Sequence, residues 1–536
     1  CWSERRFGLF VHATAATVPG WAPIGEYAEW YRSHLGDDVA DVLLHPRPMV
    51  EVLAHHRDRW GHVEHYDDFV PLLTFDRFDG EAWAELAAEA GARYSVLVTK
   101  HHDGWTWWDA PGTTRRLTEQ GPCRNVLADY AAACERHDIA LGTYYSLLDW
   151  GDERYPDATY VDEVLHPQVV DLVERYGSVM LWGDGHWGHD AGVWRTADLL
   201  RRVREVDPEI VVNDRWWASS ADAPDDAPAI VRTFEYDAPD DIVDGPWELT
   251  RGLAHSFGYN RAERAEHHMT GFDIVALYTE VLAKGGHLLL NVGPDADGTI
   301  PELQAGPLRD AGTWIRRFDA VLTAATPWDR WGGDDVRYLR DGDDLLVIDI
   351  GGRGHFAELA LDTIRVTDVE LVDDRGDHDV AWVQNDDGLA VSSRPRAGDF
   401  ETDRIGIAVY RVGVEHAERP DKLFAPHDPA PIALAPLLAE ARPGDIVQLG
   451  DGRYVGPASV PAGVVLRGLG AGRTTIGPGT GGSTIVPDPA VIEVGSNARI
   501  EHVRVSGRTS RSDWFAPPLV DISADGATLL GCTIDG

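Results

Sequence analysis

The chain has 536 residues, 43% of them hydrophobic, so it is long enough for two to four domains with buried cores. Its 48 Lys and Arg side chains are outnumbered by 89 Asp and Glu side chains, which gives a formal net charge of −41. This excess of negative charge argues against nucleic acid or an anionic membrane surface as a partner.

Targeting signals and cysteines say little about where the protein is located or whether it contains disulfides. No apolar stretch reaches the length of a membrane span, and no segment resembles a signal peptide. Because the chain starts at Cys1 rather than Met, we expect that the natural N-terminus and any export signal are missing, which leaves localisation open. The four cysteines form no CxxC motif. Cys123 and Cys134 could pair, but we expect two reduced thiols in a core.

Apolar runs of strand length alternate with helical segments along the first 330 residues. The strand-like runs are residues 7–12, 95–100, 141–146, 179–184, 210–216, 230–236 and 286–293, and the helical segments are 81–90, 129–137, 167–176, 196–206 and 272–283. Such alternation predicts βαβ units and a parallel sheet. About seven strands in this length, with no Gly-rich phosphate loop after the first, favour a (β/α)8-like barrel over a doubly wound sheet. We place the remaining strand at residues 255–258.

The pattern changes after residue 330. Short strands at 336–339, 344–350, 356–361, 369–372, 389–392 and 405–412, separated by Gly and Asp turns, predict an antiparallel β-sandwich over 331–415. Residues 416–432 are rich in Pro and charge and are predicted to be a linker. In 433–536, β-branched rungs recur about every 20 residues with Gly turns between them, which is typical of a right-handed parallel β-helix. We expect this β-helix to be incomplete.

Several predicted barrel strands end in ionisable or aromatic residues. Active sites of such barrels lie at the carboxyl ends of their strands, so these side chains are expected to converge on one pocket. An Asp between two glycines, such as Asp184, is also a good turn residue. The recurrence of polar strand ends favours a functional site instead. The residues concerned are His12, Glu29, Trp30, His101, His102, Tyr144, Trp182, Asp184, Arg215 and Glu235.

These stretches resemble glycoside hydrolase family 29, the retaining α-L-fucosidases. The similarity covers about residues 1–330 and extends more loosely to 415. Its most specific pieces are Lys-His-His-Asp-Gly at 100–104 and Leu-Leu-Leu-Asn-Val-Gly-Pro at 288–294. One departure follows the first histidine, where the family usually has Trp-Gly and this chain has His12-Ala13-Thr14. The change removes an aromatic wall from the expected pocket.

The resemblance implies a role for each matching residue. Asp184 would be the nucleophile and Glu235 the general acid/base of a double displacement through a covalent glycosyl-enzyme. The other residues would hold and surround the sugar: His12, Glu29, Trp30, His101, His102, Tyr144, Trp182 and Arg215. The expected substrate is a fucosylated oligosaccharide or glycoconjugate, with no cofactor and no metal. The linkage preference and the oligomeric state stay open.

Other interpretations remain for parts of the chain. The barrel could act on a related sugar such as an α-L-galactoside, or it could be a catalytically lapsed carbohydrate-binding protein. The Trp-rich run 105–108 could be core or a platform for the leaving group. Glu263, Glu266, His267 and His268 are predicted to be a solvated helix face. Asp295 to Gly298 is predicted to be a turn rather than half of a calcium loop.

Overall fold

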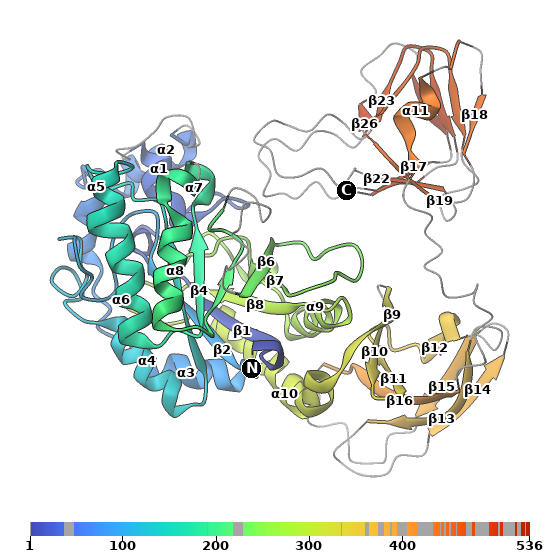
Figure 1. Cartoon of the computed structure of the whole chain (residues 1–536), viewed down its shortest axis with the longest axis horizontal. Helices are drawn as coiled ribbons and strands as arrows, with labels where there is room; N and C mark the ends of the chain where they lie inside the picture. Colours follow the sequence, from blue (N-terminus) through green and yellow to red (C-terminus); the bar gives the residue numbers. More distant parts are fainter. Residues whose placement is uncertain are drawn as a thin grey trace. The chain divides into compact units, whose positions relative to one another are not determined.

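Eight parallel strands close into a barrel in the N-terminal part of the molecule (Figure 1). The barrel is closed because β1 pairs with β2 on one side and with β8 on the other, with Gly8 opposite Tyr94 and Leu289. In chain order the strands are β1 (Phe7–Val11), β2 (Tyr94–Lys100), β3 (Ala140–Ser146), β4 (Met180–Asp184), β5 (Val211–Asn213), β6 (Ala229–Glu235), β7 (Trp247–Gly252) and β8 (His287–Val292). The predicted barrel is confirmed.

The computed structural model describes part of the chain. The described residues are 2–36, 48–189, 191–217, 229–333, 335–359, 364–372, 380–385, 388–393, 405–415, 432–439, 441–443, 446–449, 452–456, 458–467, 474–477, 492–501, 504–506, 520–521, 527–530 and 532–535. The chain divides into two compact units, residues 1–417 and 418–536. The predicted linker lies outside the described residues except for Ile432.

The barrel strands are apolar because both of their faces are buried. Every residue of β1, β2 and β4 is buried. Side chains that point into the barrel include Phe10, Val96, Met180 and Leu289, which belong to one apolar cluster. Gly8 leaves room inside the barrel for the ring of Tyr94, since a Cβ at residue 8 would lie 2.3 Å from that ring.

Helices surround the barrel and pack on the outward side chains of its strands (Figure 1). They are α1 (Tyr31–Leu35), α2 (Val50–Trp60), α3 (Gly80–Glu89), α4 (Val126–Arg136), α5 (Ala158–Tyr160), α6 (His166–Tyr176), α7 (Ala191–Trp194), α8 (Thr196–Val206), α9 (Gly271–Ala283) and α10 (Glu302–Ala324). Local sequence marks their ends. Asp79 caps the start of α3 through the amide of Glu81, and α6 ends at Gly177 in the left-handed conformation.

One predicted strand is in the wrong place. The seventh barrel strand is β7 (Trp247–Gly252), whereas residues 255–258 form a loop. The sequence of β7 places Glu248, Thr250 and Arg251 among apolar residues, so it does not look like a buried strand. Glu248 is nevertheless fully buried, because its carboxyl group is hydrogen bonded to other side chains inside the barrel.

Two antiparallel sheets follow the barrel in the same compact unit. One has the order β13-β16-β11-β10-β9 and the other the order β12-β15-β14. Their strands are β9 (Thr326–Gly333), β10 (Val336–Asp341), β11 (Asp344–Asp349), β12 (His355–Phe356), β13 (Arg365–Leu371), β14 (Val380–Asn385), β15 (Gly388–Ser393) and β16 (Ala408–Glu415). Apolar side chains of both sheets share one cluster. Five of the predicted antiparallel strands are therefore present, with β9 and β14 in addition. The predicted strand at 356–361 is wrong, because β12 ends at Phe356 and Ala357–Leu359 form a 3-10 helix.

The antiparallel sheets share part of their core with the barrel. Leu346, Ile348 and Val409 belong to the same buried cluster as the outer layer of the barrel. Trp314 on α10 donates from its indole nitrogen to the carbonyl of Ile407 at 2.9 Å. The long helix α10 thus packs on the barrel and on the sheet that contains β11 and β16.

The described residues of the second unit form short parallel strands and one short helix. From β18 to β25, each strand pairs with the strand three positions later, in the sheets β17-β19-β22-β25-β28, β18-β21-β24-β27 and β20-β23-β26. A parallel β-helix requires this pairing, and its assignment to residues 433–536 stays a prediction. The strands and one helix are β17 (Ile432–Ala433), α11 (Leu434–Leu438), β18 (Ile446–Gln448), β19 (Gly452–Val455), β20 (Ala458–Val460), β21 (Val465–Arg467), β22 (Thr474–Gly477), β23 (Ile492–Val494), β24 (Arg499–Glu501), β25 (Arg504–Ser506), β26 (Val520–Asp521), β27 (Thr528–Leu530) and β28 (Thr533–Asp535).

Candidate active site

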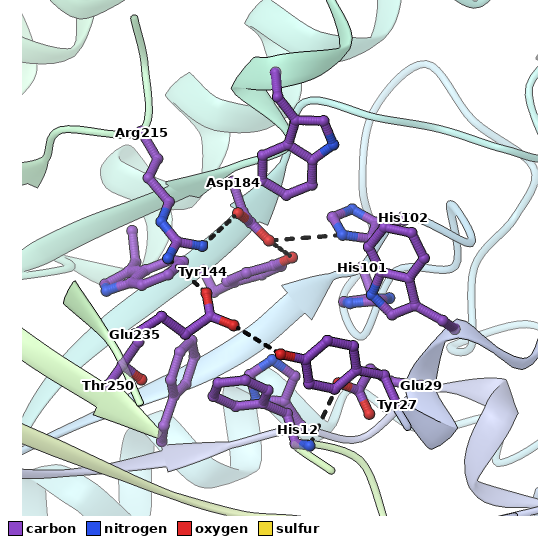
Figure 2. Close-up of a pocket in the computed structure, with 15 residues that line it drawn as sticks. His12, Tyr27, Glu29, His101, His102, Tyr144, Asp184, Arg215, Glu235 and Thr250 are labelled. Atoms are coloured by element: carbon purple, nitrogen blue, oxygen red, sulfur yellow. Dashed lines mark hydrogen bonds and ion pairs between the residues drawn. The ribbon is translucent and has the colours of Figure 1, made fainter. Parts of the chain in front are cut away.

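A pocket of about 440 Å³, counted out to its mouth, lies at the carboxyl ends of the barrel strands. It brings together all ten residues singled out in the sequence (Figure 2). It is lined by Phe10, His12, Tyr27, Glu29, Trp30, His101, His102, Tyr144, Trp182, Asp184, Trp187, Arg215, Glu235, Thr250 and Phe257. Side chains more than 200 residues apart in sequence therefore face one cavity, as the barrel topology predicts.

Asp184 is the last residue of β4, and its carboxylate has three polar neighbours (Figure 2). The phenol of Tyr144 donates to Oδ2 at 2.8 Å, and Nη1 of Arg215 donates to Oδ1 at 3.0 Å. Nε2 of His102 lies 3.6 Å from Oδ2. These groups fix the direction of a buried carboxylate while leaving it on the pocket wall.

Glu235 is the last residue of β6, and Arg215 connects it to Asp184. Nη2 of Arg215 lies 2.6 Å from Oε2 of Glu235, and Tyr27 donates to Oε1 at 3.3 Å. Burial disfavours the charge on Arg215, but the attraction of Glu235 and Asp184 outweighs burial and raises the pKa of Arg215 above its ordinary value. One guanidinium thus holds two carboxyl groups on neighbouring sides of the same cavity.

Burial keeps two histidines of the pocket, His12 and His101, in the neutral form. Burial lowers the pKa of His12 to about 3 and the pKa of His101 well below its ordinary value. The amide nitrogen of Asn291 donates to the carbonyl of Phe257 at 2.6 Å, so the amide oxygen of Asn291 accepts from Nδ1 of His12 at 2.5 Å. Nε2 of His12 is therefore left as a hydrogen-bond acceptor.

Glu29 is buried beside the loop formed by residues 255–258. Its carboxyl group accepts from the amide of Gly258 at 2.9 Å and from that of Phe257 at 3.3 Å. Burial raises the pKa of Glu29 to about 7, although these backbone hydrogen bonds oppose the rise. Near neutral pH this carboxyl group can therefore donate to or accept from a ligand hydroxyl.

Aromatic rings form much of the remaining wall. The ring of Trp30 meets those of His102 and Trp150 edge to face, with centroids 5.4 and 5.3 Å apart. Trp182 stacks on Tyr144, and the guanidinium carbon of Arg215 lies 4.9 Å from the centroid of Trp182. The wall combines flat apolar surfaces with polar edges. Such a wall is complementary to a sugar ring, which has apolar faces and polar hydroxyl groups at its edge.

The sequence did not single out five of the lining residues. They are Phe10, Tyr27, Trp187, Thr250 and Phe257. Phe10 lies on β1 two residues before His12, which directly follows the strand, so the alternation of side chains places both inside the barrel. Thr250 could be found only once β7 is recognised. Thr250 Oγ1 and His101 Nδ1 are buried without a hydrogen-bond partner among the described residues, so a bound ligand can pair with them.

Four of the open interpretations now have answers. Trp105, Trp107 and Trp108 are buried and belong to the core rather than to a platform. Asp295 forms a turn, since its side chain accepts from the amides of residues 297 and 299. The prediction of two core thiols is wrong for Cys123, which is exposed, while Cys134 is buried; both are free.

The prediction of a solvated helix face is wrong for Glu263. Its side chain is buried, and Oε1 accepts from the amides of His255 at 2.9 Å and Ser256 at 2.8 Å. The carboxyl group is needed inside because the loop 255–258 would otherwise leave these two amides without partners. Glu266, three residues later, is exposed as predicted.

Neither a metal-binding cluster nor a membrane-spanning helix is found among the described residues. No group of three or more His, Cys, Asp and Glu side chains in this part of the chain is arranged to hold a metal ion. None of the helices in the described ranges combines the length and the apolar character needed to cross a membrane.

Known proteins match the barrel in sequence and in structure. A sequence model of the alpha-L-fucosidase family matches residues 1–320. The alpha-L-fucosidase of Dictyostelium discoideum is 28% identical over 341 residues, which cover 61% of this chain and 72% of that protein. Human tissue alpha-L-fucosidase is 29% identical over 338 residues, covering 61% of this chain and 69% of its own length. The crystal structure of Thermotoga maritima alpha-fucosidase superposes with a TM-score of 0.63 at 29% identity, covering 76% of this chain and 96% of that one.

Proposed function

Because this chain belongs to the alpha-L-fucosidase family, we propose that it is a retaining exo-α-L-fucosidase in which Asp184 is the nucleophile and Glu235 the general acid/base. Its reaction is the hydrolysis of a glycosidic bond, and its substrates are glycans or glycosides that carry a terminal α-L-fucose. The observation that supports these roles is the shared contact of both carboxyl groups with Arg215 at the pocket wall.

The first step forms a covalent glycosyl-enzyme. The carboxylate of Asp184 attacks the anomeric carbon while the bond from that carbon to the leaving oxygen breaks. Protonated Glu235 gives its proton to the leaving oxygen. Arg215 and Tyr144 keep the attacking carboxylate in place through their hydrogen bonds to its two oxygens.

The second step returns the enzyme to its starting state. Glu235 is now ionised and takes a proton from water, whose oxygen bonds to the anomeric carbon as the ester to Asp184 breaks. Two displacements at one carbon restore its original configuration. Arg215 contacts both carboxyl groups, so a positive charge stays beside whichever of them is ionised.

The rest of the pocket supports a small deoxy sugar as the bound unit. Neutral His12 and His101 offer hydrogen bonds to hydroxyl groups, and near neutral pH Glu29 can donate to or accept from another. Phe10 and Phe257 offer apolar surface suited to the methyl group of a 6-deoxy sugar. We propose that Trp30 and Trp182 enclose the sugar ring.

The proposal is tested with an aryl α-L-fucoside and three variants. Asp184→Ala should lose turnover almost completely, and azide should restore it with formation of a fucosyl azide of inverted configuration. Glu235→Ala should lose about 10² to 10⁴-fold in kcat on substrates with poor leaving groups. The matched control is Asp198→Ala, which removes an exposed carboxylate on α8 and should leave kcat unchanged.

Three outcomes would contradict all or part of the proposal. Near wild-type turnover of Asp184→Ala would remove the assigned nucleophile. Sugar binding without turnover by the wild-type enzyme would favour the catalytically lapsed alternative. If the wild type prefers an aryl α-L-galactoside, the mechanism stands but the assigned sugar is wrong.

A further inference from the structure

A carboxyl group without an assigned role lies beneath the pocket. Glu248 on β7 is completely buried and points into the barrel, one inward position before Thr250 on the same strand. Leu249, between them, points outward and packs in the buried cluster between the barrel and its helices. Glu248 is therefore part of the layer that supports the pocket floor.

The burial of Glu248 lowers the stability of the fold when its carboxyl group is ionised. Burial raises the pKa of Glu248 to about 7, although hydrogen bonds from Tyr94 and Trp182 oppose the rise. Arg215, which forms its ion pairs with Asp184 and Glu235, also opposes the rise through its charge, whereas the charge of Asp214 adds to it. Among the described residues no Lys, Arg or His lies within ion-pair distance of Glu248. A buried carboxyl group without an ion pair costs free energy that an apolar side chain of similar size would avoid.

Each oxygen of Glu248 accepts one hydrogen bond. Tyr94 donates to Oε2 at 2.6 Å, and the indole nitrogen of Trp182 donates to Oε1 at 2.9 Å. An indole nitrogen can only donate, and a buried one needs an acceptor. The bond to Glu248 therefore fixes the rotation of the Trp182 ring about its long axis.

Trp182 contacts both side chains that donate to the nucleophile. Its ring stacks on that of Tyr144 at 21° between planes, with centroids 5.5 Å apart. The guanidinium of Arg215 lies 4.9 Å from the centroid of the same ring. Tyr144 and Arg215 in turn hydrogen bond the two oxygens of Asp184.

We propose that Glu248 is a positioning residue. By accepting the hydrogen bond of the Trp182 indole, it fixes the positions of the Tyr144 and Arg215 side chains, which in turn orient the carboxylate of Asp184. The role rests on the proposed function, because Asp184 must be the nucleophile for its aim to matter. Glu248 itself lies below the pocket wall and does not touch the sugar.

The test compares a conservative and a disruptive change at this position. In Glu248→Gln the amide oxygen can accept from Trp182 and the amide nitrogen can donate to Tyr94, so kcat should stay within about tenfold of wild type. Glu248→Leu removes the acceptor and should lower kcat on an aryl α-L-fucoside by about 10 to 100-fold, with KM changed by less than about threefold.

A double-mutant cycle separates positioning from general damage. Trp182→Phe keeps an aromatic ring but lacks the indole N–H, so adding Glu248→Leu to it should cost less than about threefold more in kcat. An equal loss in both backgrounds would overturn the proposal, as would an unchanged kcat in Glu248→Leu. Ser95→Ala is the control, because it removes a buried hydrogen bond from Ser95 to the carbonyl of Leu9 on β1. If Ser95→Ala loses as much kcat as Glu248→Leu, the loss reports barrel distortion and the proposal fails.

A crystal structure of Glu248→Leu gives a readout that needs no turnover. We expect a rotated Trp182 indole and a lengthened contact between Arg215 and Asp184. An indole in its wild-type place would overturn the proposal even if activity falls. If the wild-type enzyme is silent on fucosides, the proposed function fails, and this structure still decides whether Glu248 positions Trp182.

Discussion

The buried carboxyl group of Glu263 should make the stability of the barrel fall as pH rises. Burial raises the pKa of Glu263 from its ordinary 4.5 to about 7, against the backbone hydrogen bonds of Ser256 and His255. Both amides donate to Oε1. Glu263→Gln keeps an oxygen in that place and therefore removes the titration while preserving both hydrogen bonds.

The sign follows from the direction of the shift. A carboxyl group whose folded pKa is raised stabilises the fold below pH 4.5, and this contribution is lost as pH rises through 7. The pKa of Glu263 rises from 4.5 to about 7, and each pH unit corresponds to about 1.36 kcal/mol. The ionised carboxyl group therefore lowers the free energy of unfolding by about 3 kcal/mol relative to the protonated one. Most of this cost develops between pH 5 and pH 8, where it amounts to about 2 to 3 kcal/mol.

The assay is urea unfolding of wild type and Glu263→Gln at pH 5 and pH 8. The free energy of unfolding of the variant, relative to wild type, should increase by about 2 kcal/mol or more between the two pH values. Glu266→Gln is the matched control, because Glu266 is exposed and three residues away. A difference that stays constant, or that decreases toward pH 8, would refute the reasoning.

Three further changes test other contacts. Arg215→Lys replaces a two-pronged contact by one ammonium, which cannot reach both carboxyl groups, so kcat/KM for an aryl α-L-fucoside should fall by about 10² to 10³-fold; a loss below fivefold would contradict this. Asn291→Leu removes the acceptor that orients His12 and should raise KM by about tenfold, measured by steady-state kinetics, because a buried hydrogen-bonding group loses its partner. Gly8→Ala forces a Cβ to within 2.3 Å of the Tyr94 ring and should lower the free energy of unfolding by about 1 to 3 kcal/mol in urea.

The barrel could be predicted because most of its strands are apolar on both faces. Such a continuous apolar run is visible in the sequence without knowledge of the neighbouring strands. The strand β7 escaped because Glu248 and Arg251 interrupt its apolar run. The burial of Glu248 depends on hydrogen bonds from β2 and β4, which only the folded barrel brings close. The helix α10 was also missed, since Gly306, Pro307 and Gly312 look like helix breakers. Gly312 is there for packing: a Cβ would lie 1.9 Å from the carbonyl of Glu89 at the end of α3.

The catalytic residues of the site were easier to predict from the sequence than the loop residues around them. Asp184 and Glu235 end strands, so alternation and barrel topology place them at one rim. Tyr27 and Phe257 lie in loops, whose direction depends on contacts made across the barrel. The buried place of Glu263 follows from the amides of residues 255 and 256, which donate to its carboxyl group in the conformation that this loop adopts. No local pattern in the sequence carries that information.

The shared core between the barrel and the antiparallel sheets limits how this enzyme can be shortened or recombined. A cut after residue 330 would expose Leu346, Ile348 and Val409 on one piece and the matching side of α10 on the other. It would also leave the indole of Trp314 without its carbonyl acceptor at Ile407. Gene fusions and truncations should therefore treat residues 1–417 as a single cassette, with the join placed at the boundary between the two compact units. A chimera that exchanges only the barrel would need to redesign that apolar seam as well.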